Sequence, residues 1–330
     1  MKTVVCKMLD YNCNLTKVNK LDVTALMYSC NIGMSDISLK ILDYECNLEY
    51  VNNMGSTALI YACENRLEQV IIKMLNFGPD KCKINQINNY NDTALIIACD
   101  KLLKIIINKM ILFGFDYCKI NNVNTYGETA LSILCYNGLE EQAIDLLDFG
   151  YKKSGLNIIS NFNETPLYIA CVNNYEYLAS KILHFKYNEC NLNHICINNN
   201  TALIAACQNS MVSVIIKMLD KGYQYCNINV ANNYKNNAII YACSNYLSNI
   251  VLKMLDLGSD ILNINQVNCN GNTLFIISCI NNMKKVANKL LDMNCDTKQY
   301  NIYGKNAYYY AKKNNMTCVT KRLHCKCLIM

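Results

Sequence analysis

Residues 199–233 read NNTALIAACQNSMVSVIIKMLDKGYQYCNINVANN, and versions of this stretch recur along almost the whole chain. The clearest landmark is the triplet Thr201-Ala202-Leu203, whose first residue we call the anchor of its repeat. Nine anchors are spaced by 33 residues, then 36 residues six times, then 33 again, at Thr24, Thr57, Thr93, Thr129, Thr165, Thr201, Asn237, Thr273 and Asn306. Such a fixed period is typical of a repeat protein built from one structural unit.

One repeat predicts two short helices and a loop. Thr201 is a good N-cap, and the residues after it, Ala202 to Ala206, are helix formers. After a polar break, residues 212–219 supply the broad apolar face of a second helix, which Gly222 is expected to stop with a positive φ. The remaining loop is rich in Asn and has the composition of turns. Neither helix is long enough to be stable alone, so neighbouring repeats must bury their apolar faces against one another.

These features resemble the ankyrin-repeat family. The matching residues are a Thr-Ala-Leu or Thr-Pro-Leu start, a following Ala and a Gly that ends the second helix, as in Thr57-Ala58-Leu59 with Ala62 and Gly78, Thr129-Ala130-Leu131 with Gly127 and Gly150, and Thr165-Pro166-Leu167 with Ala170. The resemblance implies an all-α ankyrin-repeat solenoid of stacked helix-turn-helix units with Asn-rich, hairpin-like finger loops. The chain departs from the family pattern by lacking its usual His, and the three extra residues of the 36-residue copies are expected to lengthen the loop.

The repeats divide the chain into three predicted parts. Residues 1–23 are a half-repeat and finger, residues 24–305 are eight repeats, and residues 306–330 are a capping repeat with a basic tail. At the N-terminus, Thr3 to Asp10 align with the second helix of a repeat whose first helix is missing. A half-repeat that caps the stack explains this alignment; the alternatives are a frayed end and a true start that lies upstream.

The 21 cysteines follow the repeat rather than a disulfide or metal pattern. Eight lie six residues after an anchor, at Cys30, Cys63, Cys99, Cys135, Cys171, Cys207, Cys243 and Cys279, and seven lie eleven residues before one, at Cys13, Cys46, Cys82, Cys118, Cys190, Cys226 and Cys295. Equivalent positions in stacked helices are about 8–10 Å apart, too far for a disulfide or a shared zinc. We therefore expect a reduced ladder of small buried side chains and a reducing compartment.

The sequence offers no credible catalytic group. The three histidines, His184, His194 and His324, have no metal-binding spacing, and no phosphate-binding, dinucleotide-binding or nucleophile motif is present. Glu140 and Glu141 fit a solvated helix face better than acid–base chemistry. We expect a protein that is not an enzyme and that uses no cofactor, metal or small-molecule substrate.

Two rows of residues are candidate partner contacts. Three residues before the anchors, at the predicted finger tips, lie Met54, Tyr90, Tyr126, Phe162, Tyr234 and Tyr303, interrupted by Asn198 and Asn270. Tyrosine gives a large contact area at low entropic cost, so the tips could anchor a partner; alternatively, they pack on the neighbouring finger. A second row, four residues after the anchors, is predicted to be exposed although it is apolar, which implies either a hydrophobic partner or tighter packing: Tyr28, Tyr61, Ile97, Ile133, Ile169, Ala205, Tyr241, Ile277 and Tyr310.

The C-terminal end differs from the repeats in charge. From Lys298 onward there are seven Lys or Arg and no Asp or Glu, so the whole net charge of +6 resides there. The final residues, Cys327 to Met330, fit a prenylation motif, and Cys325 could carry a second lipid, with the basic patch as the additional membrane signal. The alternative is a soluble capping repeat. Tyr308, Tyr309 and Tyr310 are interpreted as core residues plus one exposed ring, and no nucleic-acid motif accompanies them.

The sequence therefore predicts a non-catalytic scaffold that binds partner proteins on its fingers and inner helices. The alternative is a prenylated, membrane-tethered adaptor that recruits a partner through the repeats. The high content of Asn, Ile, Lys and Tyr resembles that of ankyrin-repeat proteins of giant DNA viruses that infect amoebae. This likeness in composition implies host proteins as partners and the host cytosol as the compartment, with membrane association through the C-terminal tail as the alternative.

Overall fold

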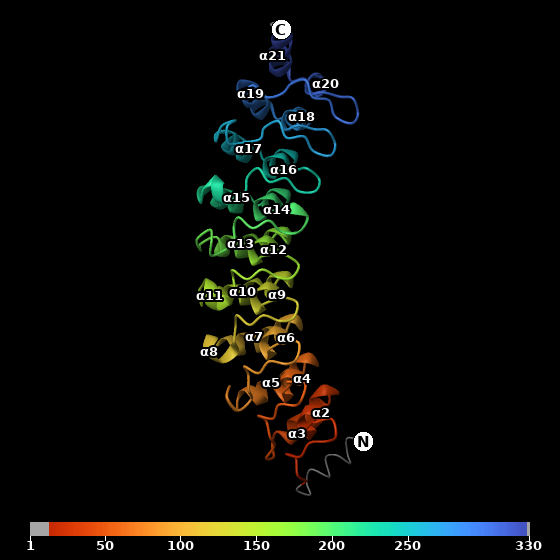
Figure 1. Cartoon of the computed structure of the whole chain (residues 1–330), viewed down its shortest axis with the longest axis vertical. Coiled ribbons are helices and arrows are strands. Elements are labelled where there is room, and N and C mark those ends of the chain that lie inside the picture. The colour runs from red at the N-terminus through yellow and green to blue at the C-terminus, as the bar shows by residue number, and fades with distance from the viewer. Residues whose placement is uncertain (1–12, 329–330) are drawn as a thin grey trace. The chain divides into compact units, whose positions relative to one another are not determined.

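The computed structural model describes the backbone of residues 13–328 and the side chains of residues 13–324. Two compact units, residues 1–162 and 163–330, are distinguished by their internal contacts. The described residues form twenty α-helices and two short 3₁₀ turns, and their only extended pairings are isolated bridges. Most helices come in pairs, one pair to each anchor, and within each unit the two members of the pairs stand in two rows (Figure 1).

The first unit contains four helix pairs. Their first helices are α2 (Ala25–Asn31), α4 (Ala58–Glu64), α6 (Ala94–Asp100) and α9 (Ala130–Tyr136). Their second helices are α3 (Ser35–Ile41), α5 (Glu68–Leu75), α7 (Lys104–Ile111) and α10 (Glu140–Leu147). Each helix packs on its partner and on the equivalent helix of the next pair, which is the stacking that a repeat too short to fold alone requires.

The second unit contains five pairs with the same arrangement. Its first helices are α12 (Pro166–Val172), α14 (Ala202–Gln208), α16 (Ala238–Ser244), α18 (Leu274–Ile280) and α20 (Ala307–Lys313). Its second helices are α13 (Glu176–Ile182), α15 (Val212–Asp220), α17 (Ser248–Leu255), α19 (Lys284–Asp292) and α21 (Thr317–Leu328). The first helices contact one another in sequence, as do the second helices.

The anchors cap the first helices as the sequence predicts. The Thr201 hydroxyl accepts a 3.1 Å hydrogen bond from the Ile204 amide, and Asn237 makes the equivalent bond with its side-chain oxygen. All nine anchors have an extended backbone and a side chain that caps the helix in this way. Because an unpaired amide at a helix start is costly, the anchor fixes where each first helix begins.

The extra residues of the longer repeats lie after the second helix. A glycine with positive φ, such as Gly114, Gly150 or Gly222, ends the pair. Short helical turns follow these glycines, namely α8 (Phe115–Cys118), α11 (Tyr151–Ser154) and η2 (Tyr223–Tyr225). In the first unit, α8 and α11 lie on the side of the second helices, whereas the finger loops project on the side of the first helices (Figure 1). The insertion therefore leaves both helices of the pair intact.

The cysteine ladder is buried at most positions. All eight cysteines six residues after an anchor have 0% exposure, and five of the seven that lie eleven residues before one are also buried. Cys13 is exposed and Cys46 is only partly covered. Burial disfavours the thiolate and so raises the pKa of Cys82 to about 11 and that of Cys118 to about 12. These thiols serve as small apolar side chains that allow the helices to approach closely.

Asparagine side chains link successive repeats. Eight residues after the anchor, Asn65 donates a 2.9 Å hydrogen bond to the Asn31 carbonyl at the end of the preceding first helix. In the second unit, Asn245 donates in the same way to the carbonyls of Cys207 and Gln208, at 2.9 and 2.8 Å. Carbonyls at a helix end have no partner within the helix, so these bonds satisfy them across the repeat boundary. Part of the high Asn content thus has a structural role.

Candidate binding surface

An asparagine shapes most fingers, and it is buried in five of them, at Asn52, Asn88, Asn124, Asn232 and Asn301. It lies five residues before the anchor, at Asn19, Asn52, Asn88, Asn124, Asn232, Asn268 and Asn301, and its side-chain oxygen accepts hydrogen bonds from the backbone amides two and four residues ahead. In one example, Asn88 accepts from Tyr90 and Asp92, both at 2.9 Å. We call this residue the finger Asn. It bends the backbone as an Asx turn does and thereby fixes the tip residue between the two amides.

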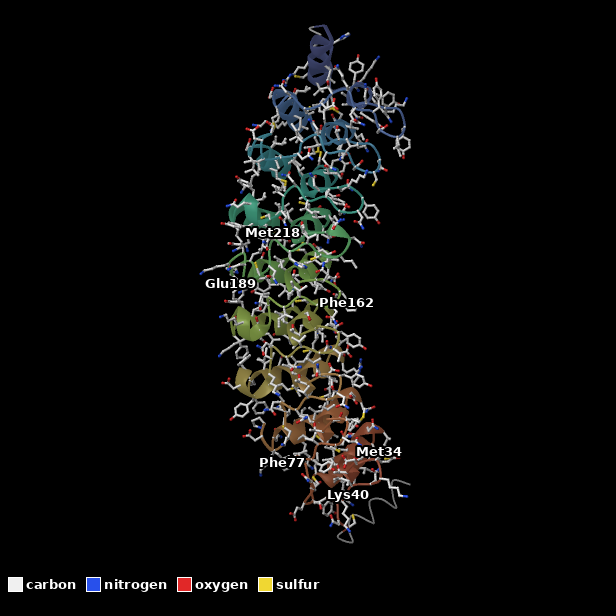
Figure 2. All side chains as sticks on the ribbon, in the orientation of Figure 1. Met34, Lys40, Phe77, Phe162, Glu189 and Met218 are labelled. Atoms are coloured by element: carbon white, nitrogen blue, oxygen red, sulfur yellow. The ribbon has the colours of Figure 1, made fainter. Side chains whose placement is uncertain are left out.

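The predicted tip residues are exposed. In the first unit, the exposed fractions are 45% for Met54, 57% for Tyr90, 59% for Tyr126 and 54% for Phe162. Phe162 lies at the edge that the fingers form (Figure 2). In the second unit, Tyr234 and Tyr303 are 67% and 69% exposed, and Asn198 and Asn270 interrupt the row as the sequence predicts. More than half of each aromatic tip is thus open to solvent, which packing on a neighbouring finger would not leave.

Backbone hydrogen bonds join each tip to the following finger. The Met54 carbonyl accepts from the Asn89 amide at 3.0 Å, and the Tyr90 carbonyl accepts from Thr125 at 3.0 Å. In the second unit, the Tyr234 carbonyl accepts from Cys269 at 3.1 Å. The backbone therefore holds the tips within a unit in a fixed row. Binding a partner there would cost this chain little conformational entropy.

The second predicted row is not an exposed face. Five of its nine members, Ile97, Ile133, Ile169, Ala205 and Ile277, are buried. The expectation of an exposed row is wrong at these positions, and the alternative of tighter packing holds. Successive first helices pack against one another, and this packing leaves little open surface at the position four residues after the anchor.

Three tyrosines of the second row are contacted by the fingers of their own repeats. The finger Asn52 donates a 3.0 Å hydrogen bond to the phenol oxygen of Tyr61, and Asn232 and Asn301 do the same to Tyr241 and Tyr310 at 3.0 and 3.1 Å. Tyr61, Tyr241 and Tyr310 are partly buried, whereas Tyr28 is 53% exposed. The hydroxyls of Tyr61 and Tyr241 are thus already engaged within their own repeats, although both were predicted as partner contacts.

The charge beside the tips changes along the chain. In the first unit, Asp92 and Glu128 directly precede their anchors, and the later equivalents are Glu164, Asn200, Asn236, Asn272 and finally Lys305. Burial raises the pKa of Asp92; a hydrogen bond with Asn124 opposes this shift, and the charges of Asp100 and Glu128 add to it. The first unit therefore presents aromatic tips beside mutually repelling carboxylates.

Two fingers lack the finger Asn. Ser160 and Cys196 occupy its position, and Ser160 Oγ is the one buried side-chain oxygen or nitrogen among the described residues that has no hydrogen-bond partner. In the finger of Cys196 the tip becomes a 3₁₀ turn, η1 (Ile197–Asn199), in which Asn198 has a φ of 57°. The finger Asn was not among the residues predicted from the sequence, although its recurrence five residues before the anchor is a signal for it.

Several predicted features fall outside the described residues. They are the half-repeat helix over Thr3 to Asp10 and the side chains of the lipidation candidates Cys325 and Cys327. None of the helices in the described part of the chain is both long and apolar enough to span a membrane. The division into repeats at residues 24–305 and 306–330 stays a prediction.

The histidines do not form a common site. His184 Nδ1 lies 3.2 Å from the Lys181 carbonyl, His194 Nε2 lies 2.9 Å from Asn163 Oδ1, and the ring of His324 is edge-on to that of Tyr308. Within residues 13–324, no three His, Cys, Asp or Glu side chains are grouped so that they could hold a metal ion. The three histidines therefore lie in separate local environments.

Comparison with known proteins finds a family match in the first part of the chain. Residues 1–85 match the family model for ankyrin repeats, in three copies. None of the curated proteins compared with this chain matches it. Together with the paired helices of both units, the match shows an all-α ankyrin-repeat solenoid fold. Ankyrin repeats generally mediate protein–protein interactions, and the proteins that contain them are typically non-catalytic scaffolds.

Proposed function

We propose that this chain is a non-catalytic scaffold that binds a partner protein through its finger tips. The observation that carries the proposal is the row of solvent-exposed tip side chains, which the finger Asn and the backbone hold in place. Exposed aromatic residues on a rigid backbone are typical of protein-binding hot spots, because they bury a large area without losing much freedom. Of the two predicted rows, only the tip row is open enough to serve as this surface.

The first unit also suggests the chemistry of the partner. Asp92 and Glu128 lie two residues after the tips Tyr90 and Tyr126. A partner segment with lysine or arginine could stack its side chain on a ring and pair its charge with the neighbouring carboxylate. The composition of the chain, which resembles that of ankyrin-repeat proteins of giant DNA viruses, makes proteins of an amoebal host the first partners to test.

The test is affinity capture from host-cell extract, followed by identification of the partner and measurement of its affinity with both proteins pure. The triple variant Tyr90→Ser, Tyr126→Ser and Phe162→Ser should weaken the captured complex by at least about 100-fold, since each lost hot spot costs about 1 kcal/mol or more. Tyr117→Ser with Tyr177→Ser is the matched control, because these tyrosines are 41% and 61% exposed but lie away from the fingers. An unchanged affinity in a triple variant that is folded by circular dichroism would exclude the tips.

A second candidate is a membrane-tethered adaptor in which Cys327 is prenylated. It is favoured by the absence of Asp and Glu after Asp296, next to seven Lys or Arg. A basic patch supplies the second signal that a single lipid needs for stable anchoring. Mass spectrometry of the C-terminal peptide from host cells tests the modification. If Cys327→Ser leaves the distribution between cytosol and membrane unchanged, the lipid anchor is excluded while the scaffold proposal still stands.

A further inference from the structure

The last finger and α20 expose more apolar surface than any other described repeat shows at the same positions. Three residues of the finger, Tyr300, Ile302 and Tyr303, are 58%, 64% and 69% exposed. On the adjoining helix, Tyr308 and Tyr309 are 38% and 42% exposed, so the expectation of core residues plus one exposed ring is wrong. The equivalent residues of the preceding repeat, Phe275 and Ile276, are 0% and 1% exposed because the next first helix covers them.

These side chains form one continuous surface. Tyr300 is bridged to the anchor Asn306 at the base of the finger. The ammonium group of Lys305 lies over the ring of Tyr309, 4.3 Å from its centre, and this contact joins the finger to α20. Lys312 and Lys313 are exposed one helical turn after Tyr308 and Tyr309, so they lie beside these rings on the same faces of the helix.

The charged side chains of residues 298–313 are all positive, and Asp296, whose carboxylate accepts a 2.8 Å hydrogen bond from the Lys298 amide, lies at the edge of this segment. Lys298, Lys305, Lys312 and Lys313 fall within it, and no Asp or Glu follows Asp296 in the sequence. The fingers of the first unit provide the contrast, because they have exposed rings of similar size beside Asp92 and Glu128. The last finger therefore favours an anionic partner, whereas the tips of the first unit favour a cationic one.

We infer that residues 298–313 bind the surface of an anionic lipid bilayer, without any covalent lipid. Tyrosine rings prefer the interface between the lipid headgroups and the hydrocarbon, and lysines around them pair with anionic headgroups. Ile302, which directly precedes the tip residue Tyr303, distinguishes between the possible anionic partners. An exposed aliphatic side chain on a projecting loop gains free energy by entering the acyl region, whereas single-stranded nucleic acid binds a basic groove in which successive bases stack on aromatic rings. This inference does not rest on the proposed protein-binding role of the other fingers.

The test is flotation of the full chain, made in bacteria so that it is not prenylated, with vesicles of phosphatidylcholine alone or mixed with phosphatidylserine. We expect the chain to float only with the mixed vesicles. Raising the salt from about 0.1 M to about 1 M, which shortens the Debye length from about 10 Å to about 3 Å, should release it. Two variants should each lower the partition coefficient by more than about tenfold, namely K298Q/K305Q/K312Q/K313Q and Y300S/I302S/Y303S.

Matched controls distinguish vesicle binding by this surface from nonspecific effects of positive charge and exposed aromatic rings. K81Q/K83Q/K152Q/K153Q removes the same charge from the first unit, and Y90S/Y126S removes rings that have acidic neighbours; both should float as the parent chain does. Three results would overturn the inference. They are no binding to mixed vesicles, equal losses in the two lysine variants, and a tip variant that loses self-association or binding to single-stranded nucleic acid while vesicle binding is unchanged.

Discussion

Asn232 donates a 3.0 Å hydrogen bond from its side-chain nitrogen to the phenol oxygen of Tyr241, nine residues ahead on α16. Its side-chain oxygen accepts from the amides of Tyr234 and Asn236 at 3.0 and 3.2 Å. One buried amide, 4% exposed, thus ties the finger to the first helix and holds the tip residue Tyr234 out in solvent. The binding surface and the stability of the repeat depend on the same side chain.

Replacing this residue should therefore be costly. We expect Asn232→Ala to lower the free energy of unfolding by about 2–3 kcal/mol, because it leaves buried amides without their partner. Urea denaturation followed by circular dichroism measures the change. Asn270→Ala, at an exposed tip, is the control. Its free energy of unfolding should be within about 0.5 kcal/mol of that of the parent chain. Equal effects of the two substitutions would show that the finger Asn has no special role.

Ser160 gives the opposite prediction at the equivalent position of another finger. Ser160 is 5% exposed, and its buried hydroxyl lacks a hydrogen-bond partner among the described residues. Ser160→Ala removes a buried polar group that is not compensated, so stability should be unchanged or should rise by up to about 1 kcal/mol. A loss of more than about 1 kcal/mol in the same denaturation experiment would reveal a partner for this hydroxyl.

The buried thiols predict a loss of stability at alkaline pH. Burial raises the pKa of Cys82 and Cys190 to about 11 and raises the pKa of Cys99 further. The pKa of a cysteine in an unfolded chain is about 8.5. Above that value the unfolded chain loses protons that the folded chain retains, so each buried thiol lowers the free energy of unfolding as the pH rises. This contribution is fully present below about pH 8 and is lost progressively as the pH approaches the folded pKa.

The change can be measured by urea denaturation in reducing buffer at pH 8, 9 and 10. Cys99→Ala should make the pH dependence shallower by up to about 1.4 kcal/mol per pH unit between pH 9 and 10, which is the contribution of one proton. Cys269→Ala, at an exposed position, is the control and should leave the slope as it is. Identical slopes for the two variants would contradict a role for thiol burial.

Two glycines at the same finger position separate backbone strain from steric exclusion. Gly271 and Gly304 have φ values of 72° and 64°. Alanine at either position should therefore lower stability by about 1 kcal/mol, because the left-handed conformation is strained for a residue with a Cβ. A Cβ on Gly271 would also lie 2.9 Å from the Asn301 Cα in the next finger, whereas a Cβ on Gly304 meets nothing within 4 Å. Gly271→Ala should thus lower the thermal midpoint clearly more than Gly304→Ala does. If the two midpoints fall equally, close packing between these fingers is not the constraint.

The sequence alone specified the repeat and its local structure. The Thr or Asn at each anchor predicted where the first helices begin, and Gly222 marked the end of its pair, because capping depends on only a few adjacent residues. Burial of most cysteines could also be predicted, since a small residue that recurs with the repeat period must occupy one equivalent position. The aromatic tips were recognisable for the same reason.

The tertiary structure decided which residues are exposed to solvent. Ile97 and Ile133 lie at positions that the sequence predicted as exposed, yet neighbouring helices bury them. Tyr308 and Tyr309 occupy positions that are buried in earlier repeats, yet they are exposed here. Local sequence sets helix starts and turns, but exposure depends on what packs over a residue from 30 or more positions away, and a single repeat does not contain that information.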